Sequence, residues 1–332
     1  MAIDPELYRA GEKDQAFRSQ PGQPESYQWW YHGVIFDNGY SLCAEMFIIN
    51  EMNAQLVFEV CDPEGKRTLV PLLYHFPSEV TVSKDTLDIT MGDNRYRGRF
   101  PKYEMHLRGG DMGADLVFEC LTQPVREPPD GVYIGRATAP PTPQYMSYIL
   151  RPRCRVTGKV VVAGKEMSVN SEEGYADHQW GNCSNLNLFY SWYWGMLHLP
   201  NHTVVWWDGL LNEKFGYQRA KWLWLYKGEK LSRYVRNANI YIESSDLGIC
   251  GATGVTRPRK VIFIIDDSDI KGTATYTMKH VLVTPADMMT WRPISLARPP
   301  RYFRYLSDVQ YNLNIEGEKI HGDGQEIHEL AI

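Results

Sequence analysis

Short runs of β-forming residues dominate the sequence, and this pattern restricts the chain to few folds. Runs rich in Val, Ile, Tyr, Trp and Phe occupy residues 29–36, 40–49, 55–61, 115–122, 155–163, 187–199, 203–211, 259–265 and 272–283. Turn-forming stretches separate them, such as DNG at 37–39 and DPEG at 62–65. Many short strands joined by regular turns predict an all-β fold of barrel or sandwich type.

The chain is long enough, at 332 residues, for two such domains. Each half carries a Trp-rich strand–turn–strand segment, at 27–49 and at 187–211. A proline-rich stretch at 124–143 is excluded from any central strand, so it is either a domain linker or a loop over a pocket mouth. We therefore expect β domains at 1–185 and 186–332.

Composition and charge argue against several function classes. The net charge of −5 gives no basic footprint for nucleic acid. The six cysteines form no C-x-x-C pair, and we expect no metal site. Phosphate-loop and nicotinamide fingerprints are missing, so we expect no cofactor. With no apolar run of about 20 residues, we expect no transmembrane segment and a cytoplasmic location. Aromatic residues make up 13% of the chain, which suits an apolar small-molecule partner. The oligomeric state stays open.

The run at 203–211 contains one acid among apolar residues. Alternation puts Trp206 and Asp208 on one face of the strand and Trp207 on the other. A buried carboxyl group favours its neutral form, which suits acid catalysis on a carbon–carbon double bond. The alternative is a strand-end Asp that caps the turn before Gly209.

The second candidate is the segment GYADHQWGN, at 174–182, in which several polar residues lie close together in sequence. His178 and Trp180 share a face, directly after Asp177. The alternative is a strand end whose polar groups satisfy backbone partners. Glu45 is a further buried-acid candidate, and it would serve equally as the partner of an arginine. Whether His178 and Asp208 are in contact is left open, because strand register cannot be read from sequence.

The remaining histidines gave weaker signals. His198 and His202 flank the turn LPN, and no third metal ligand lies nearby. His321 and His328 flank the last apolar segment, and we expect surface positions or pairing with Glu326 for them.

Three segments together carry a family resemblance: QWWYHGVIFDNGYSL (28–42), GYADHQWGN (174–182) and VVWWDG (204–209). They resemble the carotenoid 1,2-hydratase (hydroxyneurosporene synthase) family, whose relatives include lipocalin-like Diels–Alderases and cyclases. The resemblance implies two lipocalin-like β-barrel or sandwich domains with a pocket at or near their junction. In that family a His-x-Trp pair and an aromatic-x-Asp pair are tied to catalysis. His178 and Trp180 match the first pair, and Asp208 matches the second acid, with Trp206 where Tyr is usual.

The resemblance implies a cofactor-independent enzyme, a lyase or an isomerase, acting on an apolar polyene, isoprenoid or polyketide. Acid-assisted hydration, cyclisation or isomerisation is the first hypothesis. A pericyclase that folds its substrate is the second, and a carrier of hydrophobic ligands is the third. We expect Asp208 and His178 to be catalytic, with indoles stabilising a carbocation. The predicted substrate-binding residues are Trp180, Trp206, Trp192, Trp194, Tyr31, Glu45 and Asn182.

Overall fold

The computed structural model describes residues 9–19, 26–126, 132–133, 145–182, 188–251, 253–287 and 301–332. The chain divides into two compact units. Unit 1 comprises Met1–Asn185, Asn201–Thr203 and Tyr226–Ser232, and unit 2 comprises Leu186–Pro200, Val204–Leu225 and Arg233–Ile332. Each unit is built on one antiparallel sheet, and the predicted all-β, lipocalin-like architecture is confirmed.

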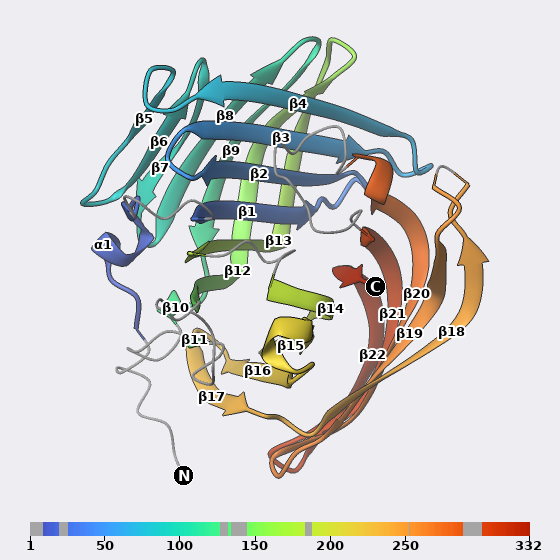
Figure 1. The fold of residues 1–332 in the computed structure, drawn as a ribbon. Coiled ribbons are helices and arrows are strands. Elements are labelled where there is room, and N and C mark those ends of the chain that lie inside the picture. Colours follow the sequence, from blue (N-terminus) through green and yellow to red (C-terminus); the bar gives the residue numbers. More distant parts are fainter. Residues whose placement is uncertain are drawn as a thin grey trace. The chain divides into compact units, whose positions relative to one another are not determined.

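Unit 1 is a 13-stranded sheet that curls into a nearly closed barrel (Figure 1). Its strand order is β4-β3-β2-β1-β13-β12-β9-β8-β7-β6-β5, and β10 and β11 add to β12. The strands are β1 (Tyr27–Ile35), β2 (Ser41–Ile49), β3 (Asn53–Cys61), β4 (Arg67–His75), β5 (Val80–Val82), β6 (Leu87–Met91), β7 (Asn94–Arg99), β8 (Lys102–Gly109), β9 (Met112–Cys120), β10 (Val125–Arg126), β11 (Val132–Tyr133), β12 (Tyr145–Val162) and β13 (Lys165–Gly181).

Alternate residues of these strands face a common apolar core. On β1 the core residues are Trp30 and Val34, and on β9 they include Leu116 and Phe118. We call the face that bears this core the inner face of unit 1. Side chains of a strand point alternately to its two faces, so every second residue reaches this core, as the alternating sequence pattern indicated.

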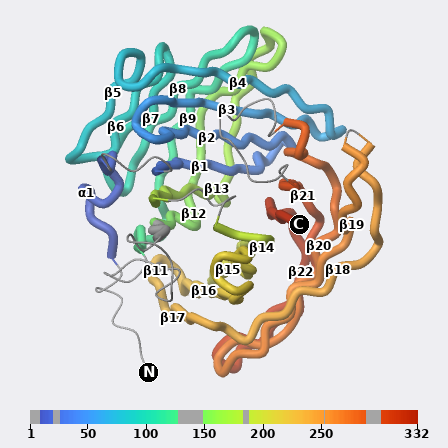
Figure 2. Tube along the Cα trace, in the orientation of Figure 1, coloured from blue at the N-terminus to red at the C-terminus, as the bar shows by residue number. Residues whose placement is uncertain are grey.

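The helix α1 (Glu12–Gln15) precedes β1 and contacts β6 (Figure 2). Gln15 and Ala16 are buried, and Phe17 joins the core. The segment around α1 therefore packs on the barrel interior. The proline-rich stretch at 124–143 lies mostly outside the described residues, apart from the short strands β10 and β11.

Unit 2 is a nine-stranded half-barrel in the order β17-β16-β15-β14-β22-β21-β20-β19-β18. A short 3-10 helix, η2 (Glu213–Phe215), follows β15. The strands are β14 (Phe189–His198), β15 (His202–Leu211), β16 (Arg219–Lys227), β17 (Lys230–Arg236), β18 (Ile240–Ile249), β19 (Thr256–Asp266), β20 (Ile270–Val283), β21 (Tyr302–Ile315) and β22 (Glu318–Ala331).

The core of unit 2 fixes which residues face inward. Val204 and Trp206 of β15 belong to it, as do Leu223 and Leu225 of β16 and Leu197 of β14. We call this face the inner face of unit 2. Even-numbered residues of β15 and odd-numbered residues of β14 and β16 therefore share it. Among the described residues, no helix is both long and apolar enough to cross a membrane.

Candidate functional site

His178 lies on the inner face of unit 1. It pairs with Trp30 in the β1–β13 register, and the two rings stack with centroids 4.5 Å apart and planes 10° apart. Burial lowers the pKa of His178 well below 6.5, and the charges of Arg151 and Arg18 lower it further. The imidazole is therefore neutral near pH 7 and available as a proton acceptor or hydrogen-bonding group.

Trp180 follows on the same face of β13. Its ring centroid lies 4.8 Å from that of His178, and the guanidinium carbon of Arg18 lies 4.7 Å from the ring centroid. An arginine therefore already occupies a cation–π position on this indole. Asn182 is buried just beyond the end of the strand. Substrate contacts by Trp180 and Asn182 stay predictions.

The opposite face of the same strands carries a second group of polar residues. Tyr31 pairs with Glu45 on β2 and with Asp177 on β13, and all three are buried. The Tyr31 hydroxyl lies 3.7 Å from the Sγ atom of Cys43. Sequence reasoning selected Tyr31 and Glu45 separately. The structure brings them together beside Asp177, on the face opposite to His178.

Asp208 lies on the inner face of unit 2 in a bidentate ion pair. Arg219 donates from Nε to Oδ1 at 2.6 Å and from Nη2 to Oδ2 at 2.8 Å. The Asp208 side chain has no exposed surface, whereas 53% of the Arg219 side chain is exposed. The hydrogen bonds to Asp208 raise the pKa of Arg219. This geometry stabilises the ionised carboxylate.

Further polar groups surround this pair on the inner face. Burial lowers the pKa of Lys221, and the nearby carboxylate of Asp208 opposes that shift. Tyr193 of β14 interacts electrostatically with Arg219, and its hydroxyl lies 3.0 Å from Oγ of Ser244, an exposed residue. Asp208 is therefore a buried carboxylate within a cluster of polar side chains, some of which are exposed to solvent. We call Asp208, Arg219, Lys221, Tyr193 and Ser244 the unit 2 polar cluster.

The predicted tryptophans of unit 2 divide between its two faces. Trp206 packs inside the core, stacked on Phe263 at 4.3 Å, and its Nε1 donates to the Tyr276 hydroxyl at 3.2 Å. Trp192 and Trp194 lie on the outer face of β14, where Trp192 stacks on Trp207 at 5.9 Å. Only Trp206 shares a face with Asp208. Substrate binding by these rings stays a prediction, and contact between Asp208 and His178, which belong to different units, stays open.

Sequence reasoning missed several buried polar contacts. His198 Nδ1 lies 3.1 Å from Oε2 of Glu326, and Oγ of Ser307 lies 2.9 Å from Nε2 of His328. The expected surface position of His328 is wrong, because this residue is buried. Arg151, fully buried inside unit 1, was also missed. Across the described ranges, no group of three His, Cys, Asp or Glu side chains is placed to hold a metal ion.

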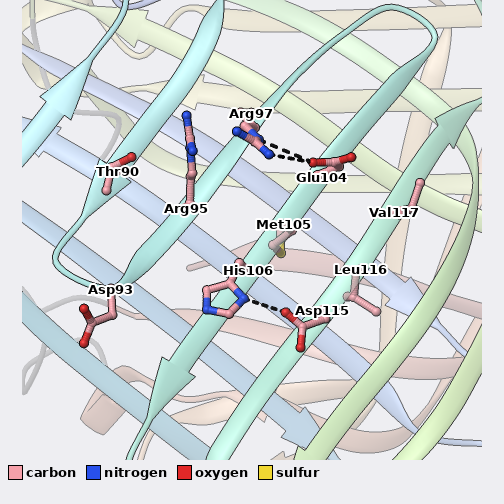
Figure 3. A pocket seen from close by; sticks show the side chains of 10 residues that line it. All are labelled: Thr90, Asp93, Arg95, Arg97, Glu104, Met105, His106, Asp115, Leu116 and Val117. Atoms are coloured by element: carbon pink, nitrogen blue, oxygen red, sulfur yellow. Dashed lines mark hydrogen bonds and ion pairs between the residues drawn. The ribbon is translucent and has the colours of Figure 1, made fainter.

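A groove of about 520 Å³ lies on the outer surface of unit 1, over β6 to β9 (Figure 3). Its polar side chains pair with one another. Arg97 Nη2 lies 3.2 Å from Oε2 of Glu104, and His106 Nδ1 lies 2.5 Å from Oδ1 of Asp115. These side chains are about half exposed. Paired and hydrated charges of this kind are more typical of a stabilised sheet surface than of a reaction site.

These features define the class of protein: a chain of two lipocalin-like β domains. No family model matches the chain, and no curated protein matches it. Solved structures share the fold at low identity. A protein described as AttH from Nitrosomonas europaea has a TM-score of 0.67 and 12% identity, with 92% of each chain covered. Kievitone hydratase from Nectria haematococca has a TM-score of 0.63 and 13% identity, covering 98% of this chain and 97% of that one. CghA, solved with Sch210972, has a TM-score of 0.61 and 11% identity with the same coverage.

Proposed function

We propose that this protein is a cofactor-independent enzyme that adds a proton to a carbon–carbon double bond of an apolar polyene, isoprenoid or polyketide. The outcome is hydration, cyclisation or isomerisation. The observation that carries the proposal is the sealed carboxylate of Asp208 beside a half-exposed partner. The name of kievitone hydratase, whose fold this chain shares, supports hydration as the first reaction to test.

The ion pair sets the conditions for acid chemistry. While Arg219 holds both oxygens, Asp208 is a proton acceptor rather than a donor. An apolar substrate that takes the place of the half-exposed Arg219 side chain would leave the buried carboxylate without its cation. Desolvation and loss of the cation both favour the neutral acid. We therefore propose that substrate binding itself prepares Asp208 as the proton donor.

In the hydration outcome, Asp208 gives its proton to one alkene carbon and a carbocation forms at the other. The oxygen of a water molecule bonds to this carbon and returns one proton to the carboxylate, so the enzyme is regenerated. The Tyr193 ring and hydroxyl share the inner face with Asp208 and are candidates to stabilise the cation and orient the water. Cyclisation replaces the water by a second alkene, and isomerisation ends with loss of a different proton.

The test is Asp208→Asn, assayed by mass spectrometry of products from prenylated phenols and linear polyenes. We expect turnover to fall by at least about a hundredfold, the usual contribution of a general acid. The matched control is Asp246→Asn, because Asp246 also pairs with an arginine, Arg259, but is exposed on the same unit. The control should keep full turnover. Full turnover by Asp208→Asn would reject the acid role.

The same ion pair favours a second candidate, a pericyclase that folds its substrate without moving a proton. A carboxylate held permanently by Arg219 fixes the shape and charge of the site and needs no titration. In that case Asp208→Asn costs little and the pH–rate profile is flat, whereas acid chemistry gives a profile with a titrating limb.

A further inference from the structure

Arg151 lies inside unit 1, where an arginine is unexpected. Its side chain is fully buried, and its register partner on β13 is Ala176. The β12–β13 pairing shifts between Arg151 and Cys154, and again before Val156. Such bulges redirect side chains. The result is a cation in the interior, where it lowers the pKa of both His32 and His178.

Few groups contact this guanidinium. Nη1 donates to Oε1 of Gln15 at 2.7 Å, and the same oxygen accepts from the Tyr103 hydroxyl at 2.8 Å. The guanidinium carbon lies 4.9 Å from the Tyr103 ring centroid and 5.8 Å from that of Tyr96. Nε and Nη2 have no hydrogen-bond partner within the described part of the chain. These two donors form the edge with which arginine binds a carboxylate side-on.

Several ionisable groups around Arg151 carry no negative charge. Burial raises the pKa of the Tyr96 and Tyr103 hydroxyls and of the Cys154 thiol, so all three are neutral near pH 7. Burial lowers the pKa of His32, which is neutral as well. No ion pair links Arg151 to a carboxylate of the described ranges. A buried charge without a counter-ion is strongly unfavourable, so Arg151 needs an anionic partner that the described residues do not supply.

We propose that the interior of unit 1 binds an amphiphilic carboxylic acid, with its carboxylate side-on against Nε and Nη2 of Arg151. The Tyr96 hydroxyl and the Gln15 carboxamide nitrogen are buried, have no hydrogen-bond partner among the described residues, and supply further donors. One cation among neutral groups suits a monoanion better than a phosphate dianion. Apolar side chains make up the rest of the interior and would surround an apolar tail that enters it. This site is independent of the reaction proposed for Asp208.

The experiment compares octanoate with 1-octanol by isothermal titration calorimetry on the full-length protein. Because hydrogen bonds to a charged group are worth about 1.5–3 kcal/mol, octanoate should bind at least about tenfold more tightly. Arg151→Met should abolish that preference. The matched control is Arg155→Met, on the same strand, where the arginine is exposed and paired with Glu172. It should leave the preference unchanged.

A second variant keeps the proposal testable if Arg151→Met does not fold. Gln15→Glu places a carboxylate against Nη1 and should weaken octanoate binding at least about tenfold by supplying the missing charge. Equal affinity of wild-type protein for octanoate and 1-octanol, or no octanoate binding up to about 1 mM, would overturn the proposal. Unchanged octanoate binding by Gln15→Glu would also overturn it. Asp208→Asn should bind octanoate normally, which separates this site from the proposed reaction.

Discussion

Replacing Arg219 by Met tests whether Asp208 is sealed inside unit 2, and no substrate is needed. The variant leaves a fully buried carboxylate without its two charged hydrogen bonds. Breaking a buried pair costs about 3–5 kcal/mol when both partners are buried. Since Arg219 is half exposed, solvent already screens part of the interaction, and we expect a loss of about 2 kcal/mol.

The assay is urea unfolding near neutral pH, with a double-mutant cycle through Asp208→Asn. The double variant should recover part of the lost stability, because it removes the unpaired charge. Acidification should shrink the difference between Arg219→Met and the wild type, since a protonated carboxyl needs no cation. The control is Arg259→Met, whose partner Asp246 is exposed, with an expected loss below about 0.5 kcal/mol.

The same variant has a kinetic consequence under the proposed acid mechanism. Removing Arg219 takes away both hydrogen bonds to the carboxylate of Asp208, so turnover should change more in Arg219→Met than in the control Arg259→Met. If Arg219→Met were as stable as the wild type near neutral pH, the reasoning would be refuted, because a buried carboxylate without its partner must destabilise the folded state.

Two further predictions concern stability alone. Burial lowers the pKa of His328 to about 3 in the folded state, so its contribution is full above about pH 6.5 and declines as pH falls towards 3. At about pH 5, the free energy of unfolding of the wild type in urea should be lower by about 2 kcal/mol than at neutral pH, a loss that His328→Gln should lack. Parallel plots of unfolding free energy against pH for the two proteins would contradict this. Gly158→Ala should destabilise unit 1 by at least about 2 kcal/mol, because φ is +148° and the new Cβ would lie 2.0 Å from the carbonyl oxygen of Asp115. A thermal unfolding midpoint equal to that of the wild type would contradict it.

Alternation along single strands was readable from the sequence, and much of the fold followed from it. The period of two in 203–211 predicted that Trp206 and Asp208 share a face and that the acid sits among apolar residues. Both features hold in the structure, where Asp208 is buried and Trp206 lies in the core. The turn-separated runs likewise predicted the all-β architecture, because the sequence supplied strand lengths and turn positions directly.

Partners from other strands were not readable. Asp208 meets Arg219 only because β15 and β16 fix a particular register, and register depends on contacts between distant segments. Alternation also leaves undecided which face is inner. His328 therefore looked like a surface residue, whereas it packs against Tyr276 and Tyr305 in unit 2. Arg151 was hidden for a related reason, since a β-bulge interrupts the regular period where it lies.

The buried charges of the two units have different surroundings, and this difference supports a proposal of ligand binding for unit 1 and of turnover for unit 2. In unit 2 the carboxylate of Asp208 has a partner that already reaches solvent, and the proposed reaction requires this pair to open and re-form in each cycle. In unit 1 the guanidinium of Arg151 is enclosed, lies near the neutral His32 and Tyr96, and has one edge without a partner among the described residues. An arginine stays protonated throughout, so it supplies no proton. A fixed charge of this kind suits the retention of an anion, whereas the exchangeable pair at Asp208 suits chemistry.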